Sequence, residues 1–248
     1  MSSNPGNPRV SNAPMSDVWV IIPAAGVGKR MSTNIPKQYL TVLGKTILEH
    51  TLDKFIQLDT QKILLVLDEH DDWFHTLTIP DSIKQRLHIV PGGAERCESV
   101  LNGLHALNDM ASDRDWVLVH DVARPCVQMD DVRQLLAYLH EQQIDVGGVL
   151  ASSVNNTLKR VDGALVDCTI DRGSVIEALT PQAFRYAVLL NAMTTAMQDS
   201  NVLVTDEAMA IEYAGLPVHV SLSSRTNIKL TEPDDLVLVE SILAHQLL

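Results

Sequence analysis

Residues 18–31 read VWVIIPAAGVGKRM, an apolar run that passes through a proline into small and then basic residues. Five consecutive apolar residues at 18–22 are typical of a strand that is buried on both faces of a sheet. The small residues after the proline would let the backbone approach a ligand closely, and successive backbone N–H groups can cradle phosphate oxygens. We therefore expect an α/β fold whose first strand leads into a loop that binds an anion.

Similar apolar runs recur along the chain and are separated by segments of helical periodicity. They occupy residues 63–67, 87–90, 116–119 and 146–151. Between them, apolar residues at i, i+3, i+4 and i+7 mark one face of a helix, as at Val132, Leu135, Leu136 and Leu139. This alternation predicts a mostly parallel, twisted sheet with helices on both faces. Ligands of such sheets bind at the carboxyl ends of the strands.

The segment from 156 to 170 breaks this alternation. Polar and apolar side chains alternate on both sides of Asp162-Gly163, a dipeptide typical of tight hairpin turns. The hairpin has no obvious helical cover, so we expect residues 152–174 to project as an arm. Further on, 217–222 and 227–230 are predicted as strands, and 231–234 as a helix start that resembles a capping box.

The composition excludes several classes of protein. Hydrophobic residues make up 46% of the 248 positions, so the chain can bury a large core. A formal net charge of −12 and an aromatic content of 4% argue against a nucleic-acid binder and a base-stacking platform. No apolar run approaches the ~18 residues of a transmembrane helix.

The same features bound the domain organisation. Residues 1–14 are polar, rich in proline and without the apolar core of a signal peptide, so we expect a disordered lead, with Met15 as an alternative start. Residues 15–248 are expected to form one domain. Cys97, Cys126 and Cys168 lie far apart without a CxxC motif, which excludes a disulfide scaffold and a zinc ribbon and favours the cytoplasm.

The loop after the first strand contains Gly26 and Gly28. A dinucleotide fingerprint would need a third glycine near position 31, where the chain has methionine, and a Walker A loop would need Ser or Thr where it has Arg30. The remaining functional interpretation is a glycine loop for a nucleoside triphosphate, with Arg30 and Lys37 nearby. A tight strand-to-helix turn with basic surface residues is the structural alternative.

The sequence GGAER at 92–96 also follows a strand, and Ser99 lies on the first turns of the expected helix. The N-terminus of a helix attracts anions and polar groups, and Ser99 could bind the edge of a base. The alternative is a plain glycine-rich connection in which Glu95 caps the helix.

The sequence HDVARP at 120–125 comes at the end of the strand 116–119. Asp121 can accept from a ribose hydroxyl or help hold a metal, and Arg124 can bind a phosphate through two hydrogen bonds. The alternative is an Asp–Arg surface pair. His120 is interpreted as a structural histidine rather than a catalyst.

Two further cations follow the hairpin, Arg172 and Lys229. A lysine on an apolar strand is costly to bury without a partner, which an anionic ligand would supply, although a lysine can also snorkel from a strand end. Thr205-Asp206-Glu207 is typical of a helix start. The chain has no Gly-x-Ser-x-Gly or His-Glu-x-x-His motif, so acyl transfer and zinc chemistry are poor explanations.

From about residue 18 to the C-terminal helix, these segments resemble, in order, the 2-C-methyl-D-erythritol 4-phosphate cytidylyltransferase family of the non-mevalonate isoprenoid pathway. The matching motifs are PAAGVGKRM, PKQYL, GGAERxxSV, VHDVARP, NTLK, DR, LTPQ, TDEA and NIKLT. The resemblance implies a Rossmann-like nucleotidyltransferase fold. It also implies transfer of CMP from CTP to methylerythritol phosphate, with release of pyrophosphate and with Mg²⁺ held mainly by the phosphates of CTP.

The resemblance further implies the residues that act. The implied catalytic residues are Arg30, Lys37, Arg172 and Lys229. The implied nucleotide-binding residues are Ala24, Ala25, Gly26, Gly28, Gly93, Ser99 and Asp121. The implied substrate-binding residues are Arg124, Thr157, Arg172, Thr180 and Lys229. A homodimer is also implied, in which the arm of each protomer reaches the site of its partner.

Two positions depart from the family's pattern. Val122 stands where alanine is common and would crowd the ribose region, and Asn156 stands where aspartate is common and removes a charge from the arm. Two other functions stay open: a cytidylyltransferase for another polyol phosphate, such as ribitol 5-phosphate, and a non-catalytic nucleotide-binding regulator. Arg30 and Lys37 together weigh against the regulator, because binding a base and a ribose would not need them.

Overall fold

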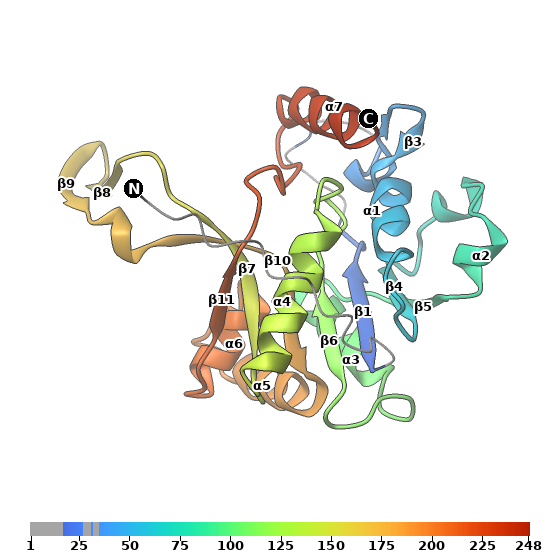
Figure 1. Ribbon diagram of the computed structural model, residues 1–248, viewed down its shortest axis with the longest axis horizontal. Helices are drawn as coiled ribbons and strands as arrows, with labels where there is room; N and C mark the ends of the chain where they lie inside the picture. The colour runs from blue at the N-terminus through green and yellow to red at the C-terminus, as the bar shows by residue number, and fades with distance from the viewer. Residues whose placement is uncertain (1–16, 27–30, 32–34) are drawn as a thin grey trace, which may run out of the picture.

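The computed structural model describes residues 17–26, 31 and 35–248. Seven strands form its central sheet in the order β11-β7-β10-β6-β1-β4-β5 (Figure 1). They are β1 (Val18–Pro23), β4 (Ile63–Leu67), β5 (Leu87–Pro91), β6 (Trp116–Val119), β7 (Gly147–Ser153), β10 (Ile176–Arg185) and β11 (His219–Leu222). β10 runs antiparallel to both neighbours, and the other pairs are parallel. The predicted α/β class and mostly parallel sheet are confirmed. The five strands predicted between residues 18 and 151 begin and end within two residues of their expected bounds.

Helices cover both faces of the sheet. They are α1 (Ile47–Phe55), α2 (Asp81–Lys84), α3 (Arg96–His105), α4 (Met129–Glu141), α5 (Tyr186–Gln198), α6 (Glu207–Tyr213) and α7 (Asp235–Gln246). Alternate residues of β1 point to opposite core layers, as a strand requires. Val20 packs with α1 and α4, whereas Ile21 packs with α3, α5 and α6. α7 packs on a third cluster that includes Val42 of the short β2 (Thr41–Val42), which pairs with β3 (Lys45–Thr46).

β10 is a strand that the sequence analysis did not predict. Pro181 and Gln182 interrupt its apolar pattern, the Thr180–Pro181 peptide is cis, and the register with β7 shifts between Ala178 and Gln182. Proline inside a run argues against a regular central strand. Here the irregular pairing accommodates it, so the local pattern was misleading.

The prediction of a strand at 227–230 was wrong. The backbone N–H groups of Ile228 and Leu230 bond to Thr226 and Ala123 instead of to a neighbouring strand. This irregular segment runs beside the loop that follows β6. The strand expected at 217–222 is shorter, because β11 begins at His219.

The start of α7 also differs from the expected capping box. The carboxylate of Asp235, inside the helix, accepts from the backbone N–H groups of Thr231 and Glu232 at 2.7 and 2.9 Å. The Thr231 hydroxyl donates to the carbonyl of Lys229 at 3.2 Å. The backbone N–H groups just before α7 are therefore bonded by a carboxylate from within the helix, instead of by a side chain that precedes it.

The predicted hairpin is present and projects from the body of the chain (Figure 1). β8 (Leu158–Asp162) pairs antiparallel with β9 (Leu165–Ile170), and Gly163 in the turn has φ +57°. Val161, Leu165 and Val166 are 59%, 76% and 61% exposed. An exposed ribbon of this kind is marginally stable by itself.

Among the residues that the structure describes, no helix is long and apolar enough to cross a membrane. The predicted lead at 1–14 and the predicted site residues Gly28 and Arg30 lie outside the described residues.

Candidate active site

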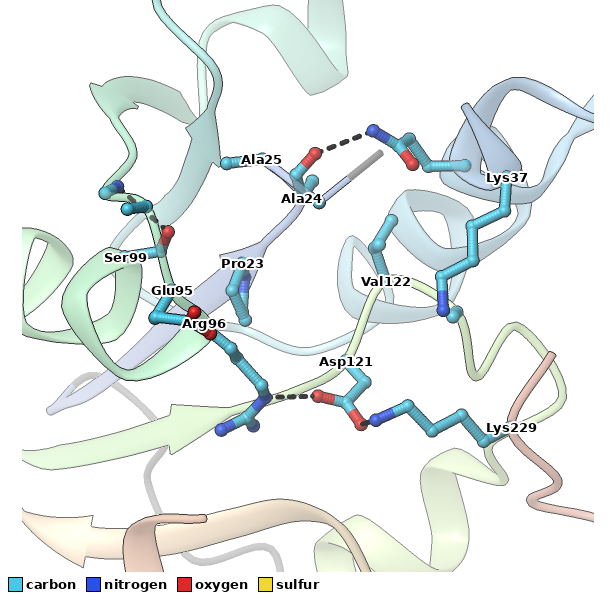
Figure 2. A pocket seen from close by; sticks show the side chains of 15 residues that line it. Pro23, Ala24, Ala25, Lys37, Glu95, Arg96, Ser99, Asp121, Val122 and Lys229 are labelled. Atoms are coloured by element: carbon cyan, nitrogen blue, oxygen red, sulfur yellow. Dashed lines mark hydrogen bonds and ion pairs between the residues drawn. The ribbon is translucent and has the colours of Figure 1, made fainter. Parts of the chain in front are cut away.

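A cleft lies at the carboxyl ends of β1 and β6, beside the N-terminus of α3 (Figure 2). Its lining residues are Pro23, Ala24, Ala25, Gly26, Lys37, Gln38, Gly93, Ala94, Glu95, Arg96, Ser99, Asp121, Val122, Ala123 and Lys229. The predicted site residues among them are Ala24, Ala25, Gly26, Lys37, Gly93, Ser99, Asp121 and Lys229. The fold thus brings together residues that are scattered over most of the sequence.

The short 3-10 helix η2 (Lys37–Tyr39) is tied to the end of β1. Gln38 Nε2 donates to the carbonyl of Ala24 at 2.8 Å, and the Ala24 N–H donates to Val66 of β4 at 2.8 Å. Lys37 Nζ donates to the carbonyl of Leu230 at 3.1 Å. These bonds hold a lysine ammonium beside the loop of small residues.

The loop before α3 packs tightly against the same strand end. A Cβ on Gly92 would lie 2.5 Å from the Cβ of Ala25, so only glycine fits there. The Gly93 N–H donates to Ser99 Oγ at 3.1 Å, and Ser99 is buried. Glu95 is the N-cap residue of α3. The segment 92–96 therefore both caps α3 and forms a wall of the cleft, so its two interpretations do not exclude each other.

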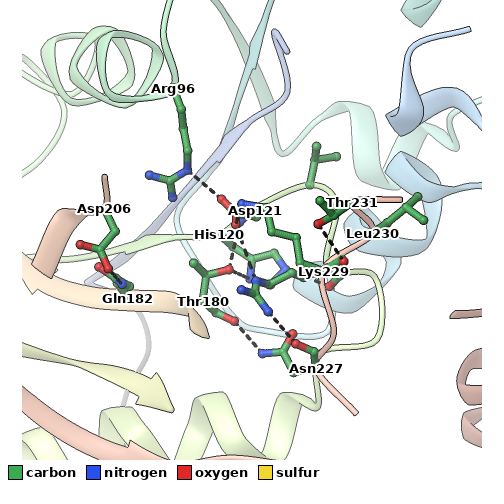
Figure 3. A network of polar contacts seen from close by, with 12 residues as sticks. Arg96, His120, Asp121, Thr180, Gln182, Asp206, Asn227, Lys229, Leu230 and Thr231 are labelled. Atoms are coloured by element: carbon green, nitrogen blue, oxygen red, sulfur yellow. Dashed lines mark hydrogen bonds and ion pairs between the residues drawn. The ribbon is translucent and has the colours of Figure 1, made fainter. Parts of the chain in front are cut away.

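Asp121 lines the cleft and lies between Arg96 and Lys229 (Figure 3), and Arg124 lies close to it as well. Its Oδ1 accepts from Arg96 Nε at 2.8 Å, its Oδ2 accepts from Lys229 Nζ at 2.7 Å, and Arg124 Nε lies 3.6 Å from Oδ2. Burial by itself would raise the pKa of Asp121, but Arg96 and Lys229 hold that pKa well below its usual range. The Asp121–Arg124 pair exists, but it is buried within a cluster instead of lying on the surface.

Arg96 and Glu207 belong to this cluster, although the sequence predicted no role in the site for either residue; they lie in the motifs GGAERxxSV and TDEA. Arg96 Nη1 and Nη2 donate to the two carboxylate oxygens of Glu207 at 2.7 and 3.2 Å. Glu207 is fully buried at the start of α6. Burial would lower the pKa of Arg96, and its two carboxylate partners raise it overall. The partners are 111 positions apart in sequence, so no local signal could have paired them.

His120 lies behind Asp121 as a neutral ring in one tautomer. Its Nε2 lies 3.1 Å from the carbonyl oxygen of Arg124, so Nε2 carries the proton and donates it. Nδ1 therefore accepts from the Thr180 hydroxyl at 3.1 Å, and Thr180 Oγ1 accepts from the Asp121 N–H at 3.1 Å. Burial lowers the pKa of His120 to about 4. The structural interpretation of His120 fits these contacts.

Arg124 and Thr180 lie beside the cleft rather than on its lining. Arg124 Nη1 donates to the carbonyl of Asn227 at 2.7 Å, and Asn227 Nδ2 donates to the carbonyl of Thr180 at 2.7 Å. These bonds fasten the irregular segment 227–230 to the end of β6. They explain how Lys229 reaches Asp121 without being part of a strand.

The arm residues are separate from the cleft. Thr157 and Arg172 are exposed, and the Arg172 guanidinium donates to the carbonyl of Asn155 at the base of the arm. Of the two departures from the family's pattern, Asn156 is exposed on the arm, whereas Val122 is buried in the cleft lining. One chain therefore does not bring its own arm residues to Asp121.

The described residues include no group of three or more His, Cys, Asp or Glu side chains that could hold a metal ion. Both carboxylate oxygens of Asp121, and both of Glu207, accept from cationic side chains. Neither carboxylate, as arranged here, fits the role of a ligand for Mg²⁺.

The fold and the cleft define a nucleotidyltransferase: a mostly parallel sheet with a loop of small residues and several cations at one edge. The family model for 2-C-methyl-D-erythritol 4-phosphate cytidylyltransferase matches residues 18–245, and the chain belongs to that family.

Relatives and solved structures agree with this membership. The chain is 42% identical to the 2-C-methyl-D-erythritol 4-phosphate cytidylyltransferase of Pectobacterium atrosepticum, over 96% of this chain and 99% of that protein. It is 44% identical to the enzyme of that name from Haemophilus influenzae, over 92% and 97% of the two chains. The crystal structure of the Francisella tularensis enzyme superposes with a TM-score of 0.77 at 36% identity, covering 92% of this chain and 100% of that one.

Proposed function

We propose that this cleft is where the chain transfers CMP from CTP to 2-C-methyl-D-erythritol 4-phosphate. The products are 4-diphosphocytidyl-2-C-methyl-D-erythritol and pyrophosphate, in the synthesis of isoprenoid precursors. The observation that carries the assignment is the cluster at Asp121, where Arg96, Arg124 and Lys229 converge beside the loop of small residues. Reactions at phosphorus depend mainly on positioning and on cations of this kind.

The nucleotide-binding side of the proposal comprises Ala24, Ala25, Gly26, Gly93 and Ser99 of the lining, with Gly28 from the same loop. Ser99 Oγ accepts from the Gly93 N–H, so the hydroxyl can direct its own proton to an acceptor on a pyrimidine base. Asp121 and the buried Val122 would border the ribose.

The chemistry needs no general base. The nucleophile is a phosphate monoester, which is mostly dianionic near pH 7 because its second pKa is about 6. One of its oxygens attacks the α-phosphorus of CTP, and the bond from that phosphorus to the pyrophosphate oxygen breaks. This agrees with a neutral His120, whose ring nitrogens are both engaged away from the cleft.

In this proposal, cationic side chains stabilise the negative charges of the phosphates. Arg30 and Lys37 neutralise the triphosphate and the leaving pyrophosphate, and Lys229 and Arg172 hold the incoming phosphate. Arg124 and Thr157 complete the substrate contacts. Thr180, whose hydroxyl bonds to His120 and to the Asp121 backbone, contributes by holding Asp121 in place. Mg²⁺ enters with CTP as part of the substrate, held by the phosphates.

We also propose a homodimer in which each arm enters the partner's cleft and brings Thr157 and Arg172 to it. The exposed apolar residues Val161, Leu165 and Val166 support this, because a two-fold exchange would bury them. Three free cysteines favour a reducing compartment, so the proposed enzyme is cytoplasmic. Its net charge of −12 argues against a nucleic-acid partner, and we propose no membrane partner.

The test is pyrophosphate release from CTP with methylerythritol phosphate and ribitol 5-phosphate side by side. Turnover with methylerythritol phosphate alone is the expected result. Turnover confined to ribitol 5-phosphate would identify a related cytidylyltransferase, and nucleotide binding without turnover would identify a regulator. ATP and GTP at matched subsaturating concentrations should be poor substrates, and equal turnover of ATP and CTP would contradict the pyrimidine pocket.

A further inference from the structure

We propose that Arg96, held by Glu207, is a positioning residue for the transfer reaction. It fixes the carboxylate of Asp121, and Asp121 in turn directs Lys229 Nζ toward the phosphates. This inference rests on the proposed function of the cleft. It concerns two residues that were not among the site residues predicted from the sequence.

The first argument is the geometry of the bridge. Arg96 and Lys229 approach Asp121 from opposite sides of the cleft (Figure 2). Two nitrogens of the Arg96 guanidinium bond to Glu207, and its Nε bonds to Asp121 at 2.8 Å. Because the guanidinium is planar and its donors are fixed, the direction of the Glu207 carboxylate sets the direction of Nε. Asp121 Oδ1 is thereby held, and Oδ2 is left for Lys229 at 2.7 Å.

The second argument is that Glu207 is itself anchored to the sheet. Gln182 on β10 is 1% exposed and bonds to the start of α6 at two points. Its Oε1 accepts from the Ala208 N–H at 2.8 Å, and its Nε2 donates to the N-cap residue Asp206 at 2.9 Å. Gln182 pairs with Val119, the last residue of β6. The bridge therefore joins Asp121, just after β6, to a helix start that is anchored on the neighbouring strand β10.

The third argument is charge. Glu207 is a fully buried carboxylate. Burying it in an ion pair costs desolvation energy, which an apolar side chain at the start of α6 would avoid, so stability alone does not explain a glutamate there. With Glu207 ionised, one guanidinium serves two carboxylates. A neutral residue at 207 would leave Arg96 paired with Asp121 alone, and Arg96 would then compete with Lys229 for that carboxylate.

The first variant is Arg96→Lys. It keeps the positive charge but cannot reach both carboxylates with fixed donors. We expect kcat to fall ~10–100-fold, the range for residues that orient the groups acting in a site. The KM for methylerythritol phosphate should rise more than the KM for CTP, because Lys229 is proposed to hold the incoming phosphate. Arg114→Lys is the matched control. Arg114 lies just before β6 and forms an exposed ion pair with Asp145.

The second measurement is a double-mutant cycle with Lys229→Ala. If Arg96 acts through Lys229, Arg96→Lys should cost little more in a chain that already lacks Lys229. A merely structural role would give penalties that multiply, and this result would overturn the proposal. So would an Arg96→Lys enzyme with normal kcat and KM.

Glu207→Gln provides an independent test, since it keeps the shape of the side chain and removes its charge. It should lower kcat in the same direction as Arg96→Lys, with a melting temperature that still reports a folded chain. If both variants fail to fold, the bridge is a scaffold and the positioning role is rejected. Failure of the proposed function is a different result, because the wild-type chain itself would then release no pyrophosphate.

Discussion

In the cleft, charged groups are enclosed by partners from the same chain, whereas the arm exposes its apolar residues. Asp121 has a side-chain exposure of 9% and accepts from two cations, and Glu207 is fully buried against Arg96. Leu165, near the tip of the arm, is 76% exposed. The geometry of the buried cluster is set by contacts within this one chain. The arm lacks internal burial, so its role depends on what it contacts.

The largest effect is expected from Lys37→Ala, which removes a cation from the cleft. Removing one preorganised group that stabilises charge typically lowers the rate ~10²–10³-fold, and we expect kcat/KM to fall by this amount with the fold intact. Arg30→Ala should behave alike. Steady-state pyrophosphate release and thermal unfolding are the measurements. Lys45→Ala removes an exposed ion pair with Asp53 and is the matched control. Near-normal turnover by a folded Lys37→Ala chain would refute the assignment.

Two glycines with positive φ compare the rigidity of the central sheet with that of the arm. At Gly147 on β7 (φ +152°), an added Cβ would lie 2.2 Å from the carbonyl oxygen of Ala183, so Gly147→Ala overpacks the sheet. We expect a loss of about 3 kcal/mol or more in the free energy of unfolding, and a melting temperature lower by roughly 6–12 °C. At Gly163 in the arm nothing lies within 4 Å of such a Cβ, and Gly163→Ala should cost about 1 kcal/mol, confined to the turn. Equal effects on global melting would contradict the contrast.

The neutral His120 predicts the pH dependence of the region behind the cleft. Its pKa is lowered from 6.5 to about 4 by burial, so the unfolded chain binds more protons than the folded one between these values. The contribution is therefore complete above about pH 6.5 and is lost as the pH falls toward 4, by up to ~3 kcal/mol. Asp121, whose pKa is lowered, loses its contribution only below its ordinary value of 3.8. Urea unfolding at pH 7, 6, 5 and 4.5 gives the free energy of unfolding at each pH. This free energy should fall less steeply toward low pH in His120→Asn than in the wild type. His70→Asn, at an 86% exposed side chain, is the control. The same pH dependence of the unfolding free energy in all three chains would exclude His120 as its source.

The exchange of arms is tested by mixing two damaged chains. Lys37→Ala has a defective cleft and an intact arm, and Thr157→Ala has the reverse. After random re-pairing of equal amounts, half of the dimers are mixed, so roughly a quarter of all sites combine an intact cleft with an intact arm. We expect pyrophosphate release to rise toward a quarter of the wild-type rate. Subunit exchange must be verified, and each variant alone is the control. Activity at the average of the two variants would mean that Thr157 serves its own subunit or no site.

Local sequence determined the elements that depend on local burial and turn chemistry. The apolar runs became β1, β4, β6 and β7 because an alternating series of strands and helices can bury such runs only inside a covered sheet. The run at 87–90 also became a strand, but β5 lies at the edge of the sheet and buries only Val90. The hairpin predicted at Asp162-Gly163 formed, with its turn at Gly163 and Ala164 between the paired residues Asp162 and Leu165, because Gly163 can adopt φ +57° without strain. The order of the motifs was sufficient to predict the family, and eight of the predicted site residues line one cleft.

Tertiary structure decided what depends on partners far along the chain. β10 became a strand despite Pro181 because β6 and β7 pair with it on both sides. The segment 227–230 lost its predicted strand because bonds to Ala123, Arg124 and Thr180 satisfy it instead. Arg96 met Glu207 across 111 positions because the sheet brings the starts of α3 and α6 to the same edge. Pairings of this kind have no periodicity in the sequence. They arise only when a packed core fixes two distant helix ends within hydrogen-bonding distance of each other.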